Sequence, residues 1–413
     1  MKKEKYKVAE TKLKKSKNKF VIITVFSIII ITIVIYYNKK LLLEKADKLI
    51  VQNSCADAFE IYKDLGNEEK YKENIDNCYY TVAKKYYDNQ DYEKSYPLFL
   101  SLVDYKDSYD LYLSSYYNLA LKYEEEEKYY DASKIFYEIL DYNDSENKYY
   151  EINDKAISTA KVGDTIFFGN YEQDGDLKNG TEPLEWYVLS SNYNYVLVLS
   201  KYILEKREFG SSYYWGNSTI REWLNSDFYN ETFSSNEKNK IQKMITSTKT
   251  EDNIFCLSAE EVRGFFVTDT SRVAYPTQRL LDDGFKTDKD AGKWWTRSIS
   301  TAADGKGVVP VEADGNVRSA GTVPYNDGSY TNIGVRPALV ISKNTISSDS
   351  QNMSLFGYDS AINDLDNEPY IPPVNKNNSN TRKCNGGVGC REGWHQCNPH
   401  SETGYCRSCC IDN

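Results

Sequence analysis

The stretch FVIITVFSIIIITIVIYY at residues 20–37 decides the architecture, because it contains no charged residue, no proline and no glycine. A helix rises about 1.5 Å per residue, so roughly 20 apolar residues cross the hydrocarbon core of a bilayer. The stretch therefore predicts one membrane-spanning helix. A cleaved signal peptide is the alternative, but the apolar run is long for one and no small-x-small cleavage site follows it.

The residues on either side of this stretch predict its orientation. Residues 1–19 contain nine lysines and two glutamates, whereas the four lysines just after the stretch are mixed with Glu44 and Asp47. Because the lysine-rich flank of a membrane helix stays in the cytoplasm, we expect a basic cytoplasmic tail at 1–19 and an extracellular C-terminus. The predicted location is the cell membrane, with a single pass through it.

The next segment, residues 38–158, repeats itself with a period of 37 residues. Within a unit the apolar positions step by three and four residues, which is the spacing of one helix face. We therefore predict three pairs of antiparallel helices stacked as a solenoid. The matching positions are Tyr80, Ala83, Tyr86, Tyr92, Phe99, Asp104, Tyr105, Asp107 and Ser108, with Tyr117, Ala120, Tyr123, Tyr129, Phe136, Asp141, Tyr142, Asp144 and Ser145; Ala46, Leu49, Ala58, Tyr62 and Leu65 belong to a weaker first copy.

Two strings in these repeats, DYKDS at 104–108 and DYNDS at 141–145, offer Asp and Ser to cap the following helix. Together with the Tyr-x-x-Ala pairs, they resemble the tetratricopeptide-type repeats of Gram-positive bacterial surface proteins. The resemblance implies an adaptor or a spacer. A rigid stalk with a Tyr/Leu core and a peptide-binding surface both fit the pattern.

Residues 159–343 show a different pattern, in which Gly, Trp and alternating apolar residues replace the helical spacing. We predict one α+β domain with a mostly antiparallel sheet. Its expected strands are 165–168, 185–190, 195–200, 254–258, 308–313, 316–320 and 335–342. Its expected helices begin at capping boxes of Thr219 with Glu222, Ser234 with Glu237 and Ser258 with Glu261, and the second of them is expected to run to about Met244.

The order of short strings in this domain resembles the DUF6273 family, a domain of unknown function on surface proteins of Firmicutes. The end of the domain also resembles, more distantly, the formylglycine-generating-enzyme-like branch of C-type-lectin-like folds. The resemblance implies no settled activity. It is carried by Gly163–Thr165, Phe168–Gly169, Tyr171–Gln173, Glu182–Trp186, Leu199–Tyr202, Arg221–Asn225, Trp294–Ser298 and Gly334–Leu339.

Several kinds of chemistry are excluded from this domain. It contains one cysteine, Cys256, whereas the formylglycine enzyme needs a cysteine pair for copper, and the apolar surroundings of Cys256 predict a small core residue. The only two histidines of the chain lie in the C-terminal tail, so a nucleophile–histidine pair and a histidine-ligated metal are unavailable. Catalysis by carboxylates stays open, through Glu185, Glu260, Asp304 and Asp314.

Tryptophans and arginines are the candidate ligand-binding residues: Trp215, Trp294, Trp295, Arg297 and Arg336. Neighbours on a strand point to opposite faces, so we expect one of Trp294 and Trp295 in the core and the other available to stack on a ligand. The arginines offer planar forks to carboxylates or anionic sugars. The alternative is that these side chains serve the core, with Arg336 paired to a buried carboxylate.

The chain ends in a predicted linker at 344–383, rich in Asn, Ser and Asp, and a cysteine-rich tail at 384–413. Cys384 and Cys390, with Cys406 and Cys409, have spacings that suit a four-thiolate zinc site. The six tail cysteines also suit three disulfides outside the cell, and both alternatives stay open. Elsewhere, the remaining cysteines Cys55, Cys78 and Cys256 are scattered along the chain.

The fold class expected from the sequence is therefore multidomain: a single transmembrane helix, an α-helical repeat solenoid and a C-type-lectin-like α+β domain. The net charge of −10 and the lack of a basic stripe after residue 20 exclude a nucleic-acid partner. We expect a membrane-anchored extracellular protein that binds a cell-wall or other carbohydrate, or a surface protein. The alternatives are an enzyme acting on wall polymer through carboxylates and an assembly adaptor that uses the repeats.

Overall fold

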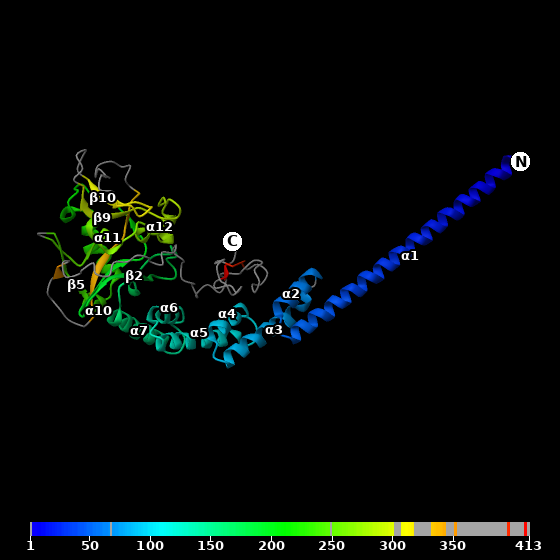
Figure 1. Ribbon diagram of the computed structural model, residues 1–413, viewed down its shortest axis with the longest axis horizontal. Helices are drawn as coiled ribbons and strands as arrows, with labels where there is room; N and C mark the ends of the chain where they lie inside the picture. Colours follow the sequence, from blue (N-terminus) through cyan, green and yellow to red (C-terminus); the bar gives the residue numbers. More distant parts are fainter. Residues whose placement is uncertain are drawn as a thin grey trace. The chain divides into compact units, whose positions relative to one another are not determined.

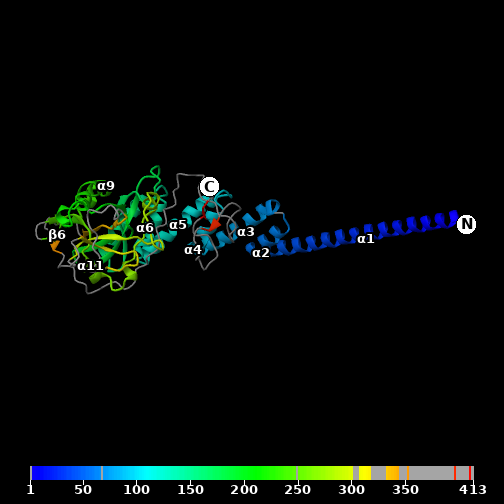
Figure 2. The same ribbon diagram turned by 90° about the horizontal axis from the view of Figure 1, so that it is seen from above.

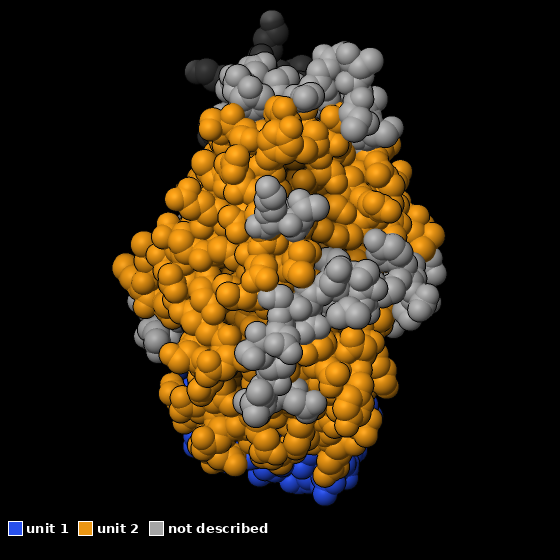
Figure 3. Space-filling model, turned by 90° about the vertical axis from the view of Figure 1, so that its left-hand side faces the viewer, with its two compact units in different colours: residues 1–118, 381–413 blue, residues 119–380 orange. Residues whose placement is uncertain are grey.

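The computed structural model describes residues 2–66, 68–247, 250–300, 307–317 and 332–343, together with three short strands at 351–352, 395–396 and 409–410. Most of the predicted linker and the tail cysteines Cys384, Cys390 and Cys406 lie outside the described residues. The chain divides into two compact units. One comprises residues 1–118 with 381–413, and the other comprises residues 119–380 (Figure 3).

The first unit begins with one unbroken helix, α1 (Lys2–Val51), which contains the whole apolar stretch (Figure 1). The segment Lys19–Val51 is long and apolar enough to cross a membrane, and its most apolar part is not buried inside the protein. Ile23 is 64% exposed and Phe26 is 61% exposed. A core helix of a soluble protein would bury such side chains, so this surface is suited to an apolar surrounding.

The helices after α1 repeat with the 37-residue period seen in the sequence. Three helices of 10 residues each begin 37 residues apart, and each follows a turn residue with φ near +60°: Asn53, Gln90 and Glu127. The equal turns show that the weak first copy in the sequence has the same local structure as the other two. The helices are α2 (Cys55–Asp64), α3 (Glu68–Asp88), α4 (Tyr92–Ser101), α5 (Ser108–Glu125), α6 (Tyr129–Glu138) and α7 (Ser145–Thr159).

The end of α1 packs against the first of the three helical pairs, α2 and α3. Ala46 in α1 and Ala58 in α2 are completely buried, which allows the two helices to pack closely. Tyr62 lies in the same core, and its hydroxyl donates to Asp47 at 2.8 Å. The apolar helix therefore runs into the first pair without a linker.

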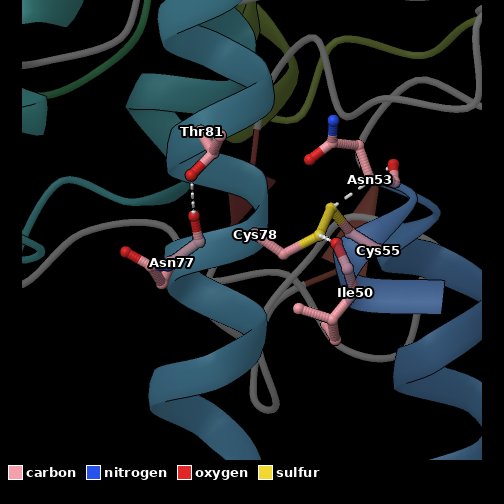
Figure 4. The surroundings of a disulfide bond; sticks show 6 residues. All are labelled: Ile50, Asn53, Cys55, Asn77, Cys78 and Thr81. Carbon is pink, nitrogen blue, oxygen red and sulfur yellow. Dashed lines mark hydrogen bonds between the residues drawn. A yellow bond between two sulfur atoms is a disulfide. The ribbon is translucent and has the colours of Figure 1, made fainter. Parts of the chain in front are cut away.

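A disulfide between Cys55 and Cys78 joins α2 to α3 (Figure 4). The sequence analysis proposed no partner for either cysteine, so this bond is known from the structure alone. The repeat contained a signal: 37 residues after Cys78 lies Ser115, whose hydroxyl receives a hydrogen bond from buried Ser95 at 3.0 Å. Cys78 thus occupies a position that faces the preceding short helix.

The second unit contains the predicted α+β domain, built around an antiparallel sheet of order β1-β2-β3-β12-β5, with β8 also pairing β12 (Figure 1). The central strands β3 and β12 are buried along almost their whole length, as their apolar runs require. The strands are β1 (Thr165–Tyr171), β2 (Glu182–Ser191), β3 (Tyr195–Ser200), β5 (Ile241–Gln242), β8 (Ile254–Phe255) and β12 (Ala338–Ser342).

A second sheet has the order β10-β9-β11-β4, in which β11 runs parallel to β9. The predicted last strand is divided at Arg336 and Pro337, so that its two halves belong to different sheets. The strands are β4 (Glu205–Lys206), β9 (Trp294–Ile299), β10 (Val308–Val311) and β11 (Gly334–Val335), and a third small sheet contains β6 (Met244–Ser247), β7 (Thr250–Asp252) and β13 (Gln351–Asn352).

Short helices connect the strands, and their caps test the predicted capping boxes. The boxes of Ser234 with Glu237 and Ser258 with Glu261 are confirmed, whereas Ser218 rather than Thr219 caps the first helix. The helix after Ser234 does not reach Met244, because the chain turns into β5 and β6 instead. The helices are α8 (Thr219–Trp223), α9 (Tyr229–Thr232), α10 (Ser235–Lys238), α11 (Ala259–Phe265) and α12 (Gln278–Asp282).

The third helical pair, α6 and α7, belongs to the same compact unit as the sheet and lies beside β1 (Figures 1 and 2). Ile157 of α7 is 4% exposed and is part of the domain core. Tyr130 of α6 stacks on Phe167 with ring centres 5.0 Å apart, and its hydroxyl donates to Glu185 at 2.5 Å. These contacts fix the pair to the sheet.

Candidate functional site

Both tryptophans of β9 are buried. They point to opposite faces as expected, but Trp294 is 0% and Trp295 is 2% exposed, so the expectation that one of them is available to a ligand is not met. The indole N–H of Trp294 donates to the carbonyl of Arg272 at 3.2 Å, and that of Trp295 donates to Arg207 at 2.8 Å. The second face of the strand is covered by a loop that the sequence pattern does not reveal.

Trp215 is also a core residue in this conformation, at 5% exposure. Its indole N–H donates to Asp252 at 2.8 Å, and the same carboxylate accepts from Arg221 at 2.6 Å. The buried charge of Asp252 is therefore paired and fully hydrogen-bonded, which is what burial of a carboxylate requires. The cluster joins α8 to β7.

The two candidate arginines are bound within the domain. Arg297 makes a two-pronged ion pair with Glu261, which also accepts from the backbone N–H of Ser258 and so links α11 to β9. Arg336 is completely buried and donates to the carbonyl of Ser200 at 2.7 Å. Burial lowers the pKa of Arg336 to about 10. Its described partners are backbone carbonyls and not the carboxylate that the sequence suggested.

Of the four carboxylates named from the sequence, Glu185 and Asp314 are hydrogen-bonded within the domain and Glu260 is exposed. Glu185 accepts from Tyr130 and, at 2.8 Å, from Lys201. Asp314 accepts from the backbone N–H of Asn316, whereas Asp304 lies outside the described residues. Cys256 is completely buried, which confirms the predicted small core residue, and burial raises the pKa of its thiol to about 12.

An acidic cluster that sequence reasoning missed is formed by the loop after β1 and the first residue of β2. One carboxylate oxygen from each of Glu172, Asp174 and Glu182 lies within 4.8 Å of the other two. Burial, together with the charges of Asp174 and Glu172, raises the pKa of Glu182 to about 7. Oxygen ligands of this kind suit Ca²⁺ or Mg²⁺, and a carboxyl with such a pKa suits proton transfer. The run EQDGDLKNGTE at 172–182 was the available signal.

A cleft of about 230 Å³ lies in the second unit, between the start of α6, the end of α7 and the start of β1. It is lined by aromatic and polar side chains, among them Tyr129, Tyr130, Asp131, Thr159, Lys161 and Thr165. No residue named as a ligand contact from the sequence lies on it. In the sequence, the repeats and the first strand were each interpreted only as packing elements. The cleft forms where the two meet, so neither pattern by itself could reveal it.

The predicted zinc site is outside what the structure describes, except for two short strands. β14 (His395–Gln396) pairs antiparallel with β15 (Cys409–Cys410), which places Gln396 opposite Cys409. Zinc binding and disulfide formation in the tail both stay predictions.

Comparison with known proteins identifies part of the α+β domain. No curated protein and no solved structure matches the chain. The family model "Domain of unknown function (DUF6273)" matches residues 193–343, which include β3, β12, the second sheet and the helices α8–α12. Residues 193–343 of this protein therefore form a DUF6273 domain.

Proposed function

We propose that the protein is a membrane-anchored binding protein, which displays its helical repeats and DUF6273 domain on the outer side of the cell membrane. The observation that carries the proposal is the continuity of α1 with a disulfide-linked helical pair. The apolar part of α1 is exposed, and its last turns pack against α2. A membrane helix that continues into the first folded pair holds the rest of the chain at the membrane surface.

The disulfide supports the outward orientation. Cys55 is 18 residues beyond the last residue of the apolar stretch, Tyr37, and its bond to Cys78 would persist in an oxidising compartment but not in a reducing cytoplasm. The lysine-rich N-terminus favours the same orientation through the positive-inside rule. Two independent kinds of chemistry thus support one topology.

The expected ligand is a carbohydrate of the cell wall or a surface protein. This part of the proposal rests on the outward display and on the cleft beside α6, because the tryptophans and arginines first considered are occupied in the core. We propose that the first two helical pairs are a spacer. The third pair, α6 and α7, is in this proposal part of the binding unit.

The topology is tested by labelling cysteines in intact cells with a membrane-impermeant maleimide, after the six tail cysteines are replaced by serine. Tyr193→Cys places a thiol at a side chain that is 88% exposed, in the turn between β2 and β3. We expect it to be labelled in intact cells, and Lys17→Cys to be labelled only after permeabilisation. Labelling of Lys17→Cys alone in intact cells would overturn the proposal.

A second candidate function is an enzyme that acts on wall polymer, favoured by the pKa of Glu182 near 7 beside two further carboxylates. Release of soluble sugar by the wild type but not by Glu182→Gln would support it. Equal release by both, or none from either, would exclude Glu182 as the acid.

A further inference from the structure

We propose that the cleft between α6, α7 and β1 binds one ring of a neutral, hydroxyl-rich sugar in a longer polysaccharide. This inference deepens the proposed function by naming the class of ligand and its site. It also moves the site away from the matched DUF6273 residues, because the whole lining lies between residues 127 and 166.

Unused hydrogen-bonding groups of both kinds line the cleft. The carboxylate of Asp131, the ammonium of Lys161 and the hydroxyl of Thr165 have no hydrogen-bond partner among the residues that the structure describes. A sugar hydroxyl both donates and accepts, so it can satisfy a carboxylate and an ammonium in the same site. A ligand that carries only acceptors could not donate a hydrogen bond to the Asp131 carboxylate, and the two groups would repel each other.

The charges of the lining argue against a strongly charged ligand. Glu127, Asp131 and Asp164 contribute three negative charges, and Lys128 and Lys161 contribute two positive charges. The mixed and nearly balanced set offers no attraction to a polyanion such as a phosphate-linked polymer. It suits a neutral ligand that is held by several individual hydrogen bonds.

Aromatic side chains give the cleft a rigid wall. Tyr130 is fixed from behind by its near-parallel stack on Phe167, with an angle of 17° between the rings, and by its hydrogen bond to Glu185. Tyr129 also lines the cleft and packs against the domain core. Side chains that are already immobilised lose little conformational freedom when a ligand binds, which favours affinity.

The size of the cleft limits the ligand. Its volume of about 230 Å³ is smaller than the roughly 300 Å³ at which pockets for drug-sized ligands begin. One sugar ring suits this space, while the neighbouring rings of a chain would continue into solvent. The third helical pair supplies one wall, so the repeats contribute directly to binding.

The test measures binding of soluble N-acetylglucosamine tetramer and of maltotetraose to the full chain in detergent micelles by titration calorimetry. We expect saturable binding of at least one probe. Asp131→Asn removes a charged acceptor and should weaken it roughly tenfold. The matched control is Asp141→Asn, an exposed aspartate of the same helical pair that is outside the cleft lining. Lys161→Gln repeats the comparison for the hydrogen-bond donor. Its control is Lys243→Gln, at an exposed lysine outside the cleft lining.

The site would be excluded if neither sugar bound, or if Asp131→Asn bound as tightly as Asp141→Asn. Tryptophan fluorescence of each variant confirms that the domain is folded. Failure here leaves the topology untouched, because maleimide labelling does not depend on a ligand. Conversely, if only Lys17→Cys were labelled in intact cells, the proposed outward orientation would be wrong. The binding measured in micelles would not be affected.

Discussion

Gly315 has a backbone conformation that only glycine adopts at low cost, with φ +81° in the turn after β10. A Cβ at this position would lie 1.7 Å from the carbonyl oxygen of Asp269, so the chain would have to move. We predict that Gly315→Ala lowers the free energy of unfolding by more than about 2 kcal/mol. Urea denaturation, followed by tryptophan fluorescence, measures this, because all tryptophans except Trp394 lie in the α+β domain.

Gly284→Ala is the matched control for Gly315→Ala. Gly284 has a similar φ of +78°, but a Cβ there meets nothing within 4 Å. Gly284→Ala should therefore lower the free energy of unfolding by about 1 kcal/mol, because of the backbone conformation alone. Equal losses at the two positions would show that the contact with Asp269 does not restrict the turn.

Glu182 should make the stability of the domain depend on pH. Burial raises its pKa from the usual 4.5 to about 7, so between these values the folded chain holds a proton that the unfolded chain has lost. The free energy of unfolding therefore falls as pH rises from about 4.5 to 7, by roughly 3 kcal/mol from this group. We expect Glu182→Gln to flatten that part of the dependence. Glu231→Gln, at an exposed position, should leave the curve unchanged; parallel curves for all three proteins would contradict the assignment.

The predictability of single residues from sequence depends on how local their surroundings are. The burial of Cys256 followed from the apolar residues beside it in the sequence, although β8 ends one residue before it. The alternation of Trp294 and Trp295 was also readable, but not the loop at Arg207 that covers the second face. The acidic cluster was missed because a loop with two positive-φ glycines, Gly175 and Gly180, has no period to detect.

At the scale of elements, the helical repeats were the most readable part of the fold. Their positions recur every 37 residues, and the bounds of α2, α4 and α6 recur with them. Turns as well as helix faces are repeated, so one strong copy determines the others. The Cys55–Cys78 disulfide was missed because its two cysteines lie on different helices, and the contact appears only when Cys78 is aligned with Ser115.

The strands of the α+β domain show where local signals fail. The capping boxes at Ser234 and Ser258 begin helices as predicted, since the cap is made within four residues. The length of the helix after Ser234 was wrong because Ile241 pairs with Ile341, about 100 residues later. Such long-range pairing overrides the local helical spacing. Stacking into a solenoid and the lectin-like relationship stay predictions.

At the scale of the molecule, the boundary between repeats and domain has a consequence for stability. The compact unit that contains the sheet begins at Leu119 and includes α6 and α7. A fragment of residues 159–380 would lose the buried Ile157, the stack of Tyr130 on Phe167 and the hydrogen bond to Glu185. We predict that it is less stable than a fragment of residues 119–380 by about 3 kcal/mol or more, or that it aggregates.

Urea denaturation of the two fragments, followed by tryptophan fluorescence, makes this comparison, because both contain the same five tryptophans at 186, 215, 223, 294 and 295. Within the longer fragment, Tyr130→Phe should reproduce part of the loss, since it leaves Glu185 with one partner fewer. Tyr150→Phe, at a side chain that is 62% exposed, should not. Equal midpoints for the two fragments would mean that the third helical pair contributes nothing to the domain, and the cleft beside it would then lack a fixed wall. A stability that depends on α6 and α7 instead makes this pair a structural part of the binding unit.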